Sequence, residues 1–198
     1  MQCFLWRGCV LSSMSSKYEC RPYRLYPDID KIFQKMILSN ISFGENVVVH
    51  PSTSINNVAF GNNIKIAKEC TIHGSEEHIV KIGSGTIFGM YVTLDGTEAD
   101  IELGENVSIA QHNVIVSNWG LTEKSVINAL FEKRAAPIRI GDHSWIGSGC
   151  VIAPGVTIGK FCVVASNSYV ESDVPDFTIV GGNPARVIRT IEPSELGL

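Results

Sequence analysis

The residues of this sequence best suited to acid–base chemistry are its five histidines. Imidazole exchanges a proton near neutral pH, so histidine is the usual side chain for accepting one in a reaction at pH 7. His112 lies in the stretch SIAQHNVIV, where QHN could hold a one-residue insertion that bulges the side chain outward. The others are interpreted as structural or exposed residues: His50, His73, His78 and His143. What each imidazole can do depends on the elements that position it.

The six cysteines are interpreted as free thiols. Three lie near the N-terminus without the C-x-x-C spacing of a metal site: Cys3, Cys9 and Cys20. The other three fall on small inward-facing positions of the repeat described below: Cys70, Cys150 and Cys162. Buried thiols that pack as small hydrophobic groups suit a reducing compartment, so we predict a cytoplasmic protein.

Composition excludes several classes of protein. The chain has 198 residues, of which 44% are hydrophobic and 18% charged, so it can bury a core and is not disordered. Its net charge of −4 argues against affinity for nucleic-acid phosphates. No apolar run reaches the ~20 residues that span a bilayer. The start MQCFLWRGCVLSSM is split by Arg7 and is not expected to be a signal peptide.

A period of six residues organises the chain. From residue 140 an aliphatic residue returns at every sixth position, at Ile140, Ile146, Ile152, Ile158, Val164 and Val170. A small or β-branched residue follows four places later, at Ser144, Cys150, Val156, Cys162, Ser168 and Val174. The aliphatic series extends backwards through Leu103, Ile109, Ile115, Ile82, Phe88, Leu94, Phe60, Ile66, Ile72, Phe43, Val49 and Ile55. These positions make about six groups of three hexapeptides.

Each hexapeptide fits a short strand and a turn, since alternation along a strand sends its first and fifth side chains inward. Three hexapeptides close a triangular coil of about 18 residues, and coils stacked about 4.8 Å apart bury a continuous aliphatic column. Glycine, asparagine and aspartate after the aliphatic residues suit tight turns, as at Gly104, Asn106, Gly141, Asp142, Gly147, Gly155 and Gly159. We therefore predict an all-β solenoid over residues 41–191.

Interruptions of the repeat predict loops and ends. Extra residues follow Ile72 (HGSEEH) and Leu94, and the longest interruption, SNWGLTEKSVINALFEKRAA, spans residues 117–136. We expect the latter to protrude and to contain a short helix capped by Thr122. Residues 1–40 do not repeat, and a helix beginning after Pro27 is expected to cap the first coil. Residues 192–198 form a C-terminal tail.

The stretches IGDHSWIGSGCVIAPGVTIG and GGNPARVIR give the chain its resemblance to a known family. Together with the period of six, they resemble the hexapeptide-repeat acyltransferases, particularly the saccharide O-acetyltransferases. The resemblance implies a left-handed parallel β-helix, acetyl-CoA as donor, a sugar hydroxyl as acceptor and no metal. It also implies a homotrimer with active sites between subunits, into which the long loop of a neighbouring copy reaches. A role in surface-polysaccharide biosynthesis is the expectation for such an acceptor.

The resemblance also implies a set of site residues. In the family the catalytic histidine stands near the start of the long loop, where this chain has Trp119 in SNWG. His112 is the nearest replacement and is our predicted catalytic base, with a backbone N–H near Ser148 steadying the oxyanion. After subtraction of the loop, His112 and His143 are expected to be vertical neighbours on successive coils. Asp95 and Trp119 are expected to contact the sugar.

For coenzyme A, the resemblance implies contacts from Trp145, Ser148, Ala165, Ser166, Arg186 and Arg189. The two arginines would meet phosphates. Relatives carry Thr-Lys where this chain has Glu171 and Ser172, so Lys160 is a candidate substitute for the lysine.

Two other functions remain open. Without the loop histidine and the lysine, the chain could be a non-catalytic binding or scaffold protein, which coenzyme A titration would distinguish from an enzyme. The γ-type carbonic anhydrases share this fold and bind zinc through histidines that include an H-x4-H pair. His73 and His78 have that spacing, although His50 and His112 do not stand one coil away to complete the site.

Overall fold

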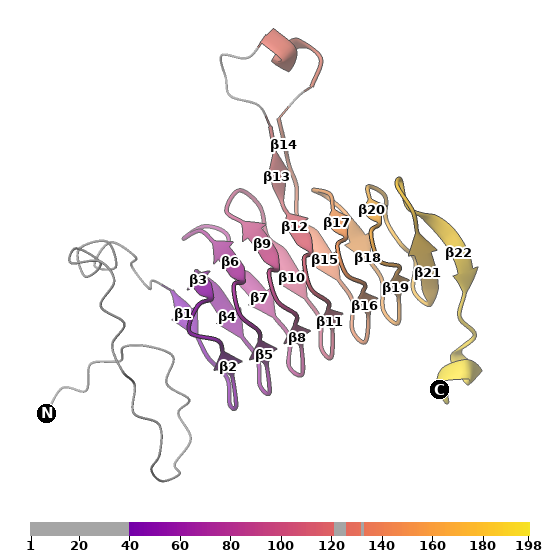
Figure 1. Ribbon diagram of the computed structural model, residues 1–198, viewed down its shortest axis with the longest axis horizontal. Helices are drawn as coiled ribbons and strands as arrows, with labels where there is room; N and C mark the ends of the chain where they lie inside the picture. Colours follow the sequence, from indigo (N-terminus) through magenta and orange to yellow (C-terminus); the bar gives the residue numbers. More distant parts are fainter. Residues whose placement is uncertain (1–39, 121–125, 132) are drawn as a thin grey trace, which may run out of the picture.

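The computed structural model describes residues 40–120, 126–131 and 133–198. Two features predicted from the sequence, the helix after Pro27 and the cap at Thr122, lie outside the described residues, as do Cys3, Cys9 and Cys20. Three parallel sheets run the length of the solenoid and form its sides (Figure 1).

Each of the six coils contributes one strand to each sheet, and sheet B also contains the final strands β21 and β22. Sheet A contains β1 (Ile41–Ser42), β4 (Val58–Phe60), β7 (Val80–Ile82), β10 (Ile101–Leu103), β15 (Ile138–Ile140) and β18 (Thr157–Ile158). Sheet B contains β2 (Val48–Val49), β5 (Lys65–Ile66), β8 (Ile87–Phe88), β11 (Ser108–Ile109), β16 (Trp145–Ile146), β19 (Val163–Val164), β21 (Thr178–Gly181) and β22 (Arg186–Thr190). Sheet C contains β3 (Ser54–Asn56), β6 (Thr71–Gly74), β9 (Thr93–Gly96), β12 (Val114–Val116), β17 (Val151–Ile152) and β20 (Tyr169–Val170). The expected β-helix of about six coils is confirmed.

The aliphatic column lies where the repeat predicts it. The side chains of the series from Ile140 to Val170 are buried, as are the small residues from Ser144 to Val174. Phe43 is an exception, since it is 57% exposed and stacks on Phe60 with ring centroids 5.3 Å apart. Among the described residues this first coil has a neighbouring coil on one side only, so Phe43 is left uncovered. The prediction of an inward Phe43 is wrong.

The cysteines of the repeat are free and buried, as predicted. Each thiol donates a hydrogen bond to a carbonyl oxygen, from Cys70 to Gly89, from Cys150 to Ala165 and from Cys162 to Pro175. Burial raises the pKa of all three thiols, because the apolar interior disfavours a thiolate.

The turns between sheets A and B show why glycine recurs there. The left-handed φ falls mostly on other residues, at Asn46, Asn63, Gly85, Asn106, His143 and Phe161. The glycines at the start of these turns are needed for close stacking instead. A Cβ on Gly141 would lie 2.6 Å from the carbonyl carbon of Gly159 in the next coil. Backbone therefore packs on backbone from coil to coil.

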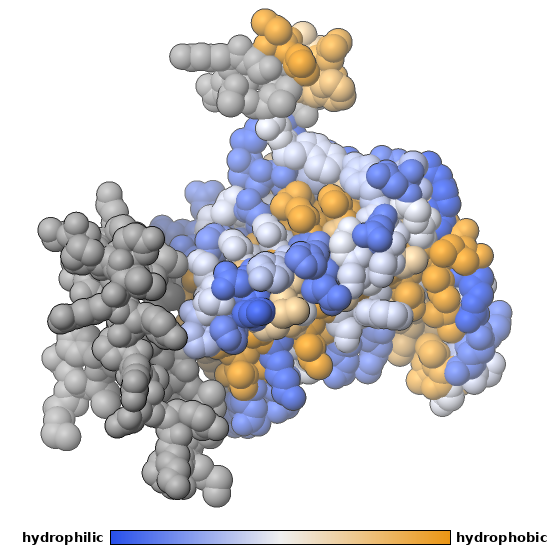
Figure 2. Space-filling view, in the orientation of Figure 1, coloured by the Kyte–Doolittle hydropathy of each residue, from blue (hydrophilic) through white to orange (hydrophobic). Residues whose placement is uncertain are grey.

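A hairpin leaves the solenoid between the fourth and fifth coils, as the protruding loop was expected to do (Figure 1). Its strands are β13 (Asn118–Trp119) and β14 (Arg134–Ala135), and its outer part includes the 3₁₀ turn η1 (Val126–Ala129). The coils resume in register, with Ile101 paired to Ile138 across the insertion. Apolar residues gather at its tip (Figure 2), where Val126 is 89% and Leu130 is 79% exposed.

The chain ends on an antiparallel pair. β22 returns along β21 and is followed by the 3₁₀ turn η2 (Pro193–Leu196). None of the helices in the described residues is long and apolar enough to cross a membrane.

Candidate functional site

The turns between sheets B and C bring together four of the predicted site residues. His112, Ser148, Ala165 and Ser166 lie on this edge, which we call the coenzyme corner (residues 110–113, 147–150 and 165–168). The Ser148 N–H donates to Ser166 Oγ at 3.1 Å, and the Ala165 N–H donates to the Val180 carbonyl at 2.8 Å. The Ser148 hydroxyl and the Ser166 N–H take part in none of the hydrogen bonds among the described residues, so both are available to a ligand at this corner.

His112 occupies a regular turn, not a bulge. The turn of residues 110–113 has the same length as residues 89–92 and 147–150, and the register from Val114 to Thr93 and Val151 is unbroken. His112 takes the left-handed φ of the turn, 60°, as does Tyr91 one coil earlier. The two rings stack with centroids 4.9 Å apart and planes 6° apart. The expected one-residue insertion is therefore wrong.

His112 and His143 are not vertical neighbours, which corrects a second prediction. The coils on either side of the loop are offset by 37 residues, as in the bond from Cys150 N–H to Asn113, so the residue above His112 is Gly149. His143 lies at the corner between sheets A and B and stacks on Phe161 at 5.1 Å. The count of residues across the loop was wrong by one hexapeptide. His143 therefore lies at a different edge of the prism from His112.

The other residues expected to hold the coenzyme are dispersed. Trp145 is 53% exposed on sheet B, beside the coenzyme corner. Arg189 is exposed and paired to Glu195 at 2.9 Å. Arg186 lines a hollow beside Glu171 and Asp173, which carry the opposite charge.

Lys160, the candidate substitute for the phosphate-facing lysine, is engaged elsewhere. Its ammonium contacts Asp142 at 2.7 Å, at the corner between sheets A and B. Near the C-terminal end of the coenzyme corner, Arg186 donates to the Ala185 carbonyl at 2.8 Å and lines a hollow with two carboxylates.

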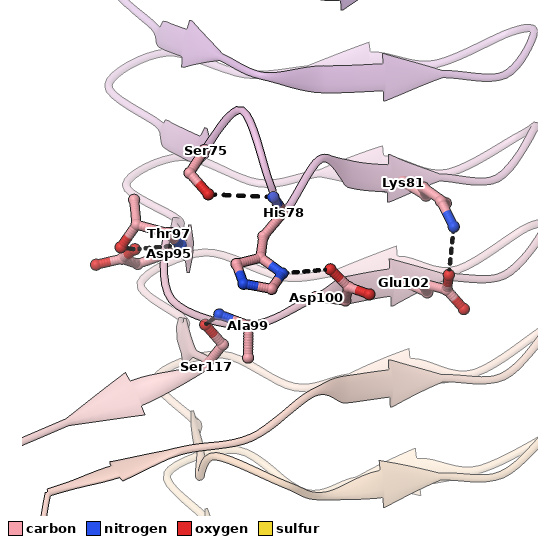
Figure 3. Close-up of polar contacts among 9 residues, drawn as sticks. All are labelled: Ser75, His78, Lys81, Asp95, Thr97, Ala99, Asp100, Glu102 and Ser117. Carbon is pink, nitrogen blue, oxygen red and sulfur yellow. Dashed lines mark hydrogen bonds and ion pairs between the residues drawn. The ribbon is translucent and has the colours of Figure 1, made fainter.

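Asp95 and Trp119 both lie toward the opposite edge of sheet C, where the hairpin leaves the solenoid. We call this edge the hairpin corner (residues 75–79, 97–100 and 117–120). The Asp95 carboxylate accepts hydrogen bonds from the N–H and hydroxyl of Thr97, at 3.0 and 2.6 Å (Figure 3). Trp119 is half-buried and packs on Tyr169, with ring centroids 6.3 Å apart. Asp95 is thus a strand residue of β9 that holds the following turn through one carboxylate oxygen and has the other available.

The hairpin corner also contains a histidine–aspartate pair that the sequence reasoning missed. His78 Nδ1 lies 2.8 Å from Asp100 Oδ1, and the side chains are 32% and 49% exposed (Figure 3). The two residues are 22 positions apart and come from successive turns of the same edge. The signal in the sequence was the HGSEEH interruption. Pairing it with Asp100 required the lengths of both interruptions, which the repeat does not give.

His73 has a different environment on the outer face of sheet C. Its Nε2 lies 2.8 Å from Ser54 Oγ, and it stands in register beside Asp95. Partial burial lowers the pKa of His73 below its ordinary value of 6.5, and the negative charge of Asp95 opposes this shift. The imidazole is therefore neutral at pH 7.

The histidines of the zinc alternative do not converge. His73 bonds to Ser54, His78 to Asp100 and His50 to Ser52. The part of the chain that the structure describes contains no group of three His, Cys, Asp or Glu side chains placed to hold a metal ion.

Comparison with known proteins agrees with this architecture. Residues 137–172 match the family model of the bacterial transferase hexapeptide with six repeats. This part of the chain therefore carries the hexapeptide repeat of the bacterial transferases. Residues of this chain are 42% identical, over 91 residues, to the galactoside O-acetyltransferase of Escherichia coli, covering 46% of this chain and 44% of that enzyme.

Other proteins are similar to this chain over longer stretches. YvoF of Bacillus subtilis, a protein named as an acetyltransferase, is 35% identical over 113 residues, which are 57% of this chain and 62% of YvoF. The chain thus spans less than two thirds of the length of either relative. The N-acyltransferase AntD from Bacillus cereus, solved with dTDP and 3-hydroxybutyryl-CoA, shares the fold with a TM-score of 0.70 and 23% identity, over 84% of this chain and 91% of AntD.

Proposed function

We propose that this protein transfers an acetyl group from acetyl-CoA to a hydroxyl of a saccharide. The observation that carries the proposal is the coenzyme corner, where the Ser148 hydroxyl and the Ser166 N–H are available beside the exposed indole of Trp145. A pantetheine arm carries two amides, which a row of small residues can approach closely and bond. The similarity to a galactoside O-acetyltransferase supports a hydroxyl of a sugar as acceptor.

The acceptor belongs at the hairpin corner in this proposal. The Asp95 carboxylate can accept hydrogen bonds from sugar hydroxyls, and the half-buried indole of Trp119 offers an apolar face for a sugar ring. A saccharide destined for a surface polysaccharide would present such hydroxyls. A panel of acceptor sugars would identify this saccharide.

The two corners lie at opposite edges of sheet C within one chain. A site that joins coenzyme and acceptor therefore forms between copies, with the coenzyme corner of one copy facing the hairpin corner of another. The apolar tip of the hairpin supports this arrangement, since Val126, Leu130 and Phe131 are exposed in a single copy. We propose a homotrimer, in which each hairpin reaches the neighbouring copy.

Direct transfer needs a base for the acceptor hydroxyl and a donor for the oxyanion of the tetrahedral intermediate. The Ser148 N–H is already bonded to Ser166, so the Ser166 N–H is the better donor at this corner. His112 borders the coenzyme corner and is the base that the sequence suggests. His78 at the hairpin corner is a second candidate for the base.

Thiol release from acetyl-CoA tests this function. We expect coenzyme release in the presence of hydroxyl sugars and little release with acceptor omitted. Amino sugars in the same panel distinguish O-transfer from N-transfer. Isothermal titration with coenzyme A identifies the remaining alternatives, since a binding protein would bind without turnover and a scaffold would do neither.

A further inference from the structure

We infer that the base which takes the acceptor proton is His78, positioned by Asp100 at the hairpin corner. The inference deepens the proposed acyl transfer and rests on it. Of the five histidines, which all lie in the described part of the chain, His78 alone bonds a carboxylate.

The pair is built into the foot of the hairpin. The Ala99 N–H donates to Ser117 Oγ at 3.2 Å, where the hairpin leaves the solenoid (Figure 3). The Ile138 N–H donates to the Asp100 carbonyl at 2.9 Å, where the hairpin returns. Asp100 is therefore fixed by the same backbone contacts that set the direction of the hairpin. An acceptor held between the hairpin and the coils would lie next to the imidazole.

The backbone of His78 is fixed as well. Its N–H donates to Ser75 Oγ at 3.1 Å, and its carbonyl accepts from the Ser75 N–H at 2.8 Å. The carbonyl also packs closely on Gly74, where a Cβ would lie 2.3 Å away. The interruption HGSEEH is thus a closed turn that fixes the backbone from which the imidazole extends.

The hydrogen bond to Asp100 selects the useful tautomer. A carboxylate accepts, so Nδ1 carries the proton and Nε2 keeps its lone pair. Nε2 makes no hydrogen bond with the described residues, and a third of the side chain is exposed. The free nitrogen can therefore accept a proton from a hydroxyl.

The other histidines lack one of these features. The ring of His112 stacks on Tyr91 and has no carboxylate to orient it. His73 has its Nε2 occupied by Ser54, and His50 is bonded to Ser52. His143 stacks on Phe161 at the edge between sheets A and B, away from both corners of the proposed site.

Proton transfer to the imidazole accompanies the attack of the acceptor on the thioester. The acceptor hydroxyl gives its proton to Nε2 as its oxygen forms a bond to the thioester carbonyl carbon. The tetrahedral intermediate then expels the coenzyme thiolate by breaking the C–S bond. The thiolate takes the proton from the imidazolium, which Asp100 has stabilised in the meantime.

Kinetics of five variants test the inference, with coenzyme A affinity measured by isothermal titration in each. We expect His78→Ala to lower kcat roughly 10²–10⁴-fold, as the loss of a general base does. Coenzyme A affinity should stay within about twofold, since His78 lies away from the coenzyme corner. Added imidazole should restore part of the activity of His78→Ala. Asp100→Asn should lower kcat by roughly tenfold or more at unchanged KM for acetyl-CoA, because an amide holds the ring without stabilising its charge, and Asp100→Glu should recover part of the loss.

His143→Ala, away from both corners, is the matched control and should retain wild-type kcat within about threefold. The inference is overturned if His78→Ala keeps near-full kcat while still folded by circular dichroism, or if His112→Ala alone shows the large loss. A wild-type protein that binds coenzyme A and acetylates nothing in the panel refutes the proposed function itself, which is a separate result from either variant outcome.

Discussion

Neighbouring side chains set the charge of the polar residues around sheet C. His73 is half-buried, and desolvation lowers its pKa below 6.5 even though Asp95 opposes the shift. The neutral ring keeps its hydrogen bond to Ser54. His78, in the turn directly after β6, is instead bonded to a carboxylate. Two histidines five residues apart in sequence thus have different roles because each bonds to a different coil.

The lowered pKa of His73 makes folding stability depend on pH. Below 6.5 the unfolded chain binds a proton at this residue that the folded chain does not, so stability falls as pH decreases through the folded pKa. In urea unfolding at pH 7.5 and pH 5.5, the midpoint of the wild type should fall more on acidification than that of His73→Gln. An equal fall in both proteins would contradict the burial of this imidazole.

The three thiols of the repeat should be unreactive in the folded protein. Burial raises the pKa of Cys70, Cys150 and Cys162, and the thiolate is the reactive form. A variant with serine at the three N-terminal cysteines isolates this group. It should react slowly with Ellman's reagent at pH 8 and yield three thiols in denaturant. Rapid reaction of the native variant would contradict the packing of the column.

At the scale of the elements, each turn depends on the turn above it. Side chains at the corner between sheets A and B accept from the backbone of the preceding coil, as Asp142 does from the Glu105 N–H at 2.9 Å. The pKa of Asp142 is lowered by the hydrogen bond from Lys160 and by this backbone bond. The glycine before each such residue leaves room for the next coil.

Gly141→Ala should therefore destabilise the protein. The added Cβ would meet backbone atoms of Gly159 and Lys160 that cannot rotate away. We expect a loss of about 2 kcal/mol or more in the free energy of unfolding, the range of an overpacked core. Thr157→Ala, on the exposed face of β18, is the control and should unfold within about 0.5 kcal/mol of the wild type. Similar stability of both variants would show that the coils can separate locally.

The sequence predicts the geometry within each hexapeptide but not the contacts made across the interruptions of the repeat. The buried column from Ile140 to Val170 follows from the period of six, because each hexapeptide repeats the same local geometry. Contacts across interruptions do not follow from it. The pairing of His78 with Asp100 spans 22 residues and two interruptions, and a count wrong by one hexapeptide put His143 beside His112. The residue types of the site were visible in sequence, but which edge each one occupies depends on loop lengths.

At the scale of the whole molecule, the sides of the prism differ in chemistry. The outer face of sheet A carries a charged ladder, in which Lys81 and Arg139 both contact Glu102, at 2.7 and 3.5 Å. Sheet B presents apolar residues such as Ile87 and Trp145, and the hairpin carries its apolar tip away from the body (Figure 2). Charged and apolar sides of one solenoid favour association through the apolar ones.

Assembly should therefore depend on the hairpin tip. Light scattering should give the wild type the mass of three copies. Leu130→Ser combined with Phe131→Ser should lower that mass and acetyl transfer together, since the exposed apolar contacts would be lost. Lys81→Ala on the charged face is the control and should remain trimeric. A trimeric double variant, or a monomeric wild type that is fully active, would contradict a site formed between copies.

A crystal structure with acetyl-CoA gives the most direct test of a site formed between the coenzyme corner of one copy and His78 of another. We expect a pantetheine arm along the coenzyme corner, bonded to the Ser148 hydroxyl and the Ser166 N–H. Its thioester should be directed at the His78 imidazole of an adjoining copy. Coenzyme bound on another side of the prism, or a thioester nearest to His112, would contradict it.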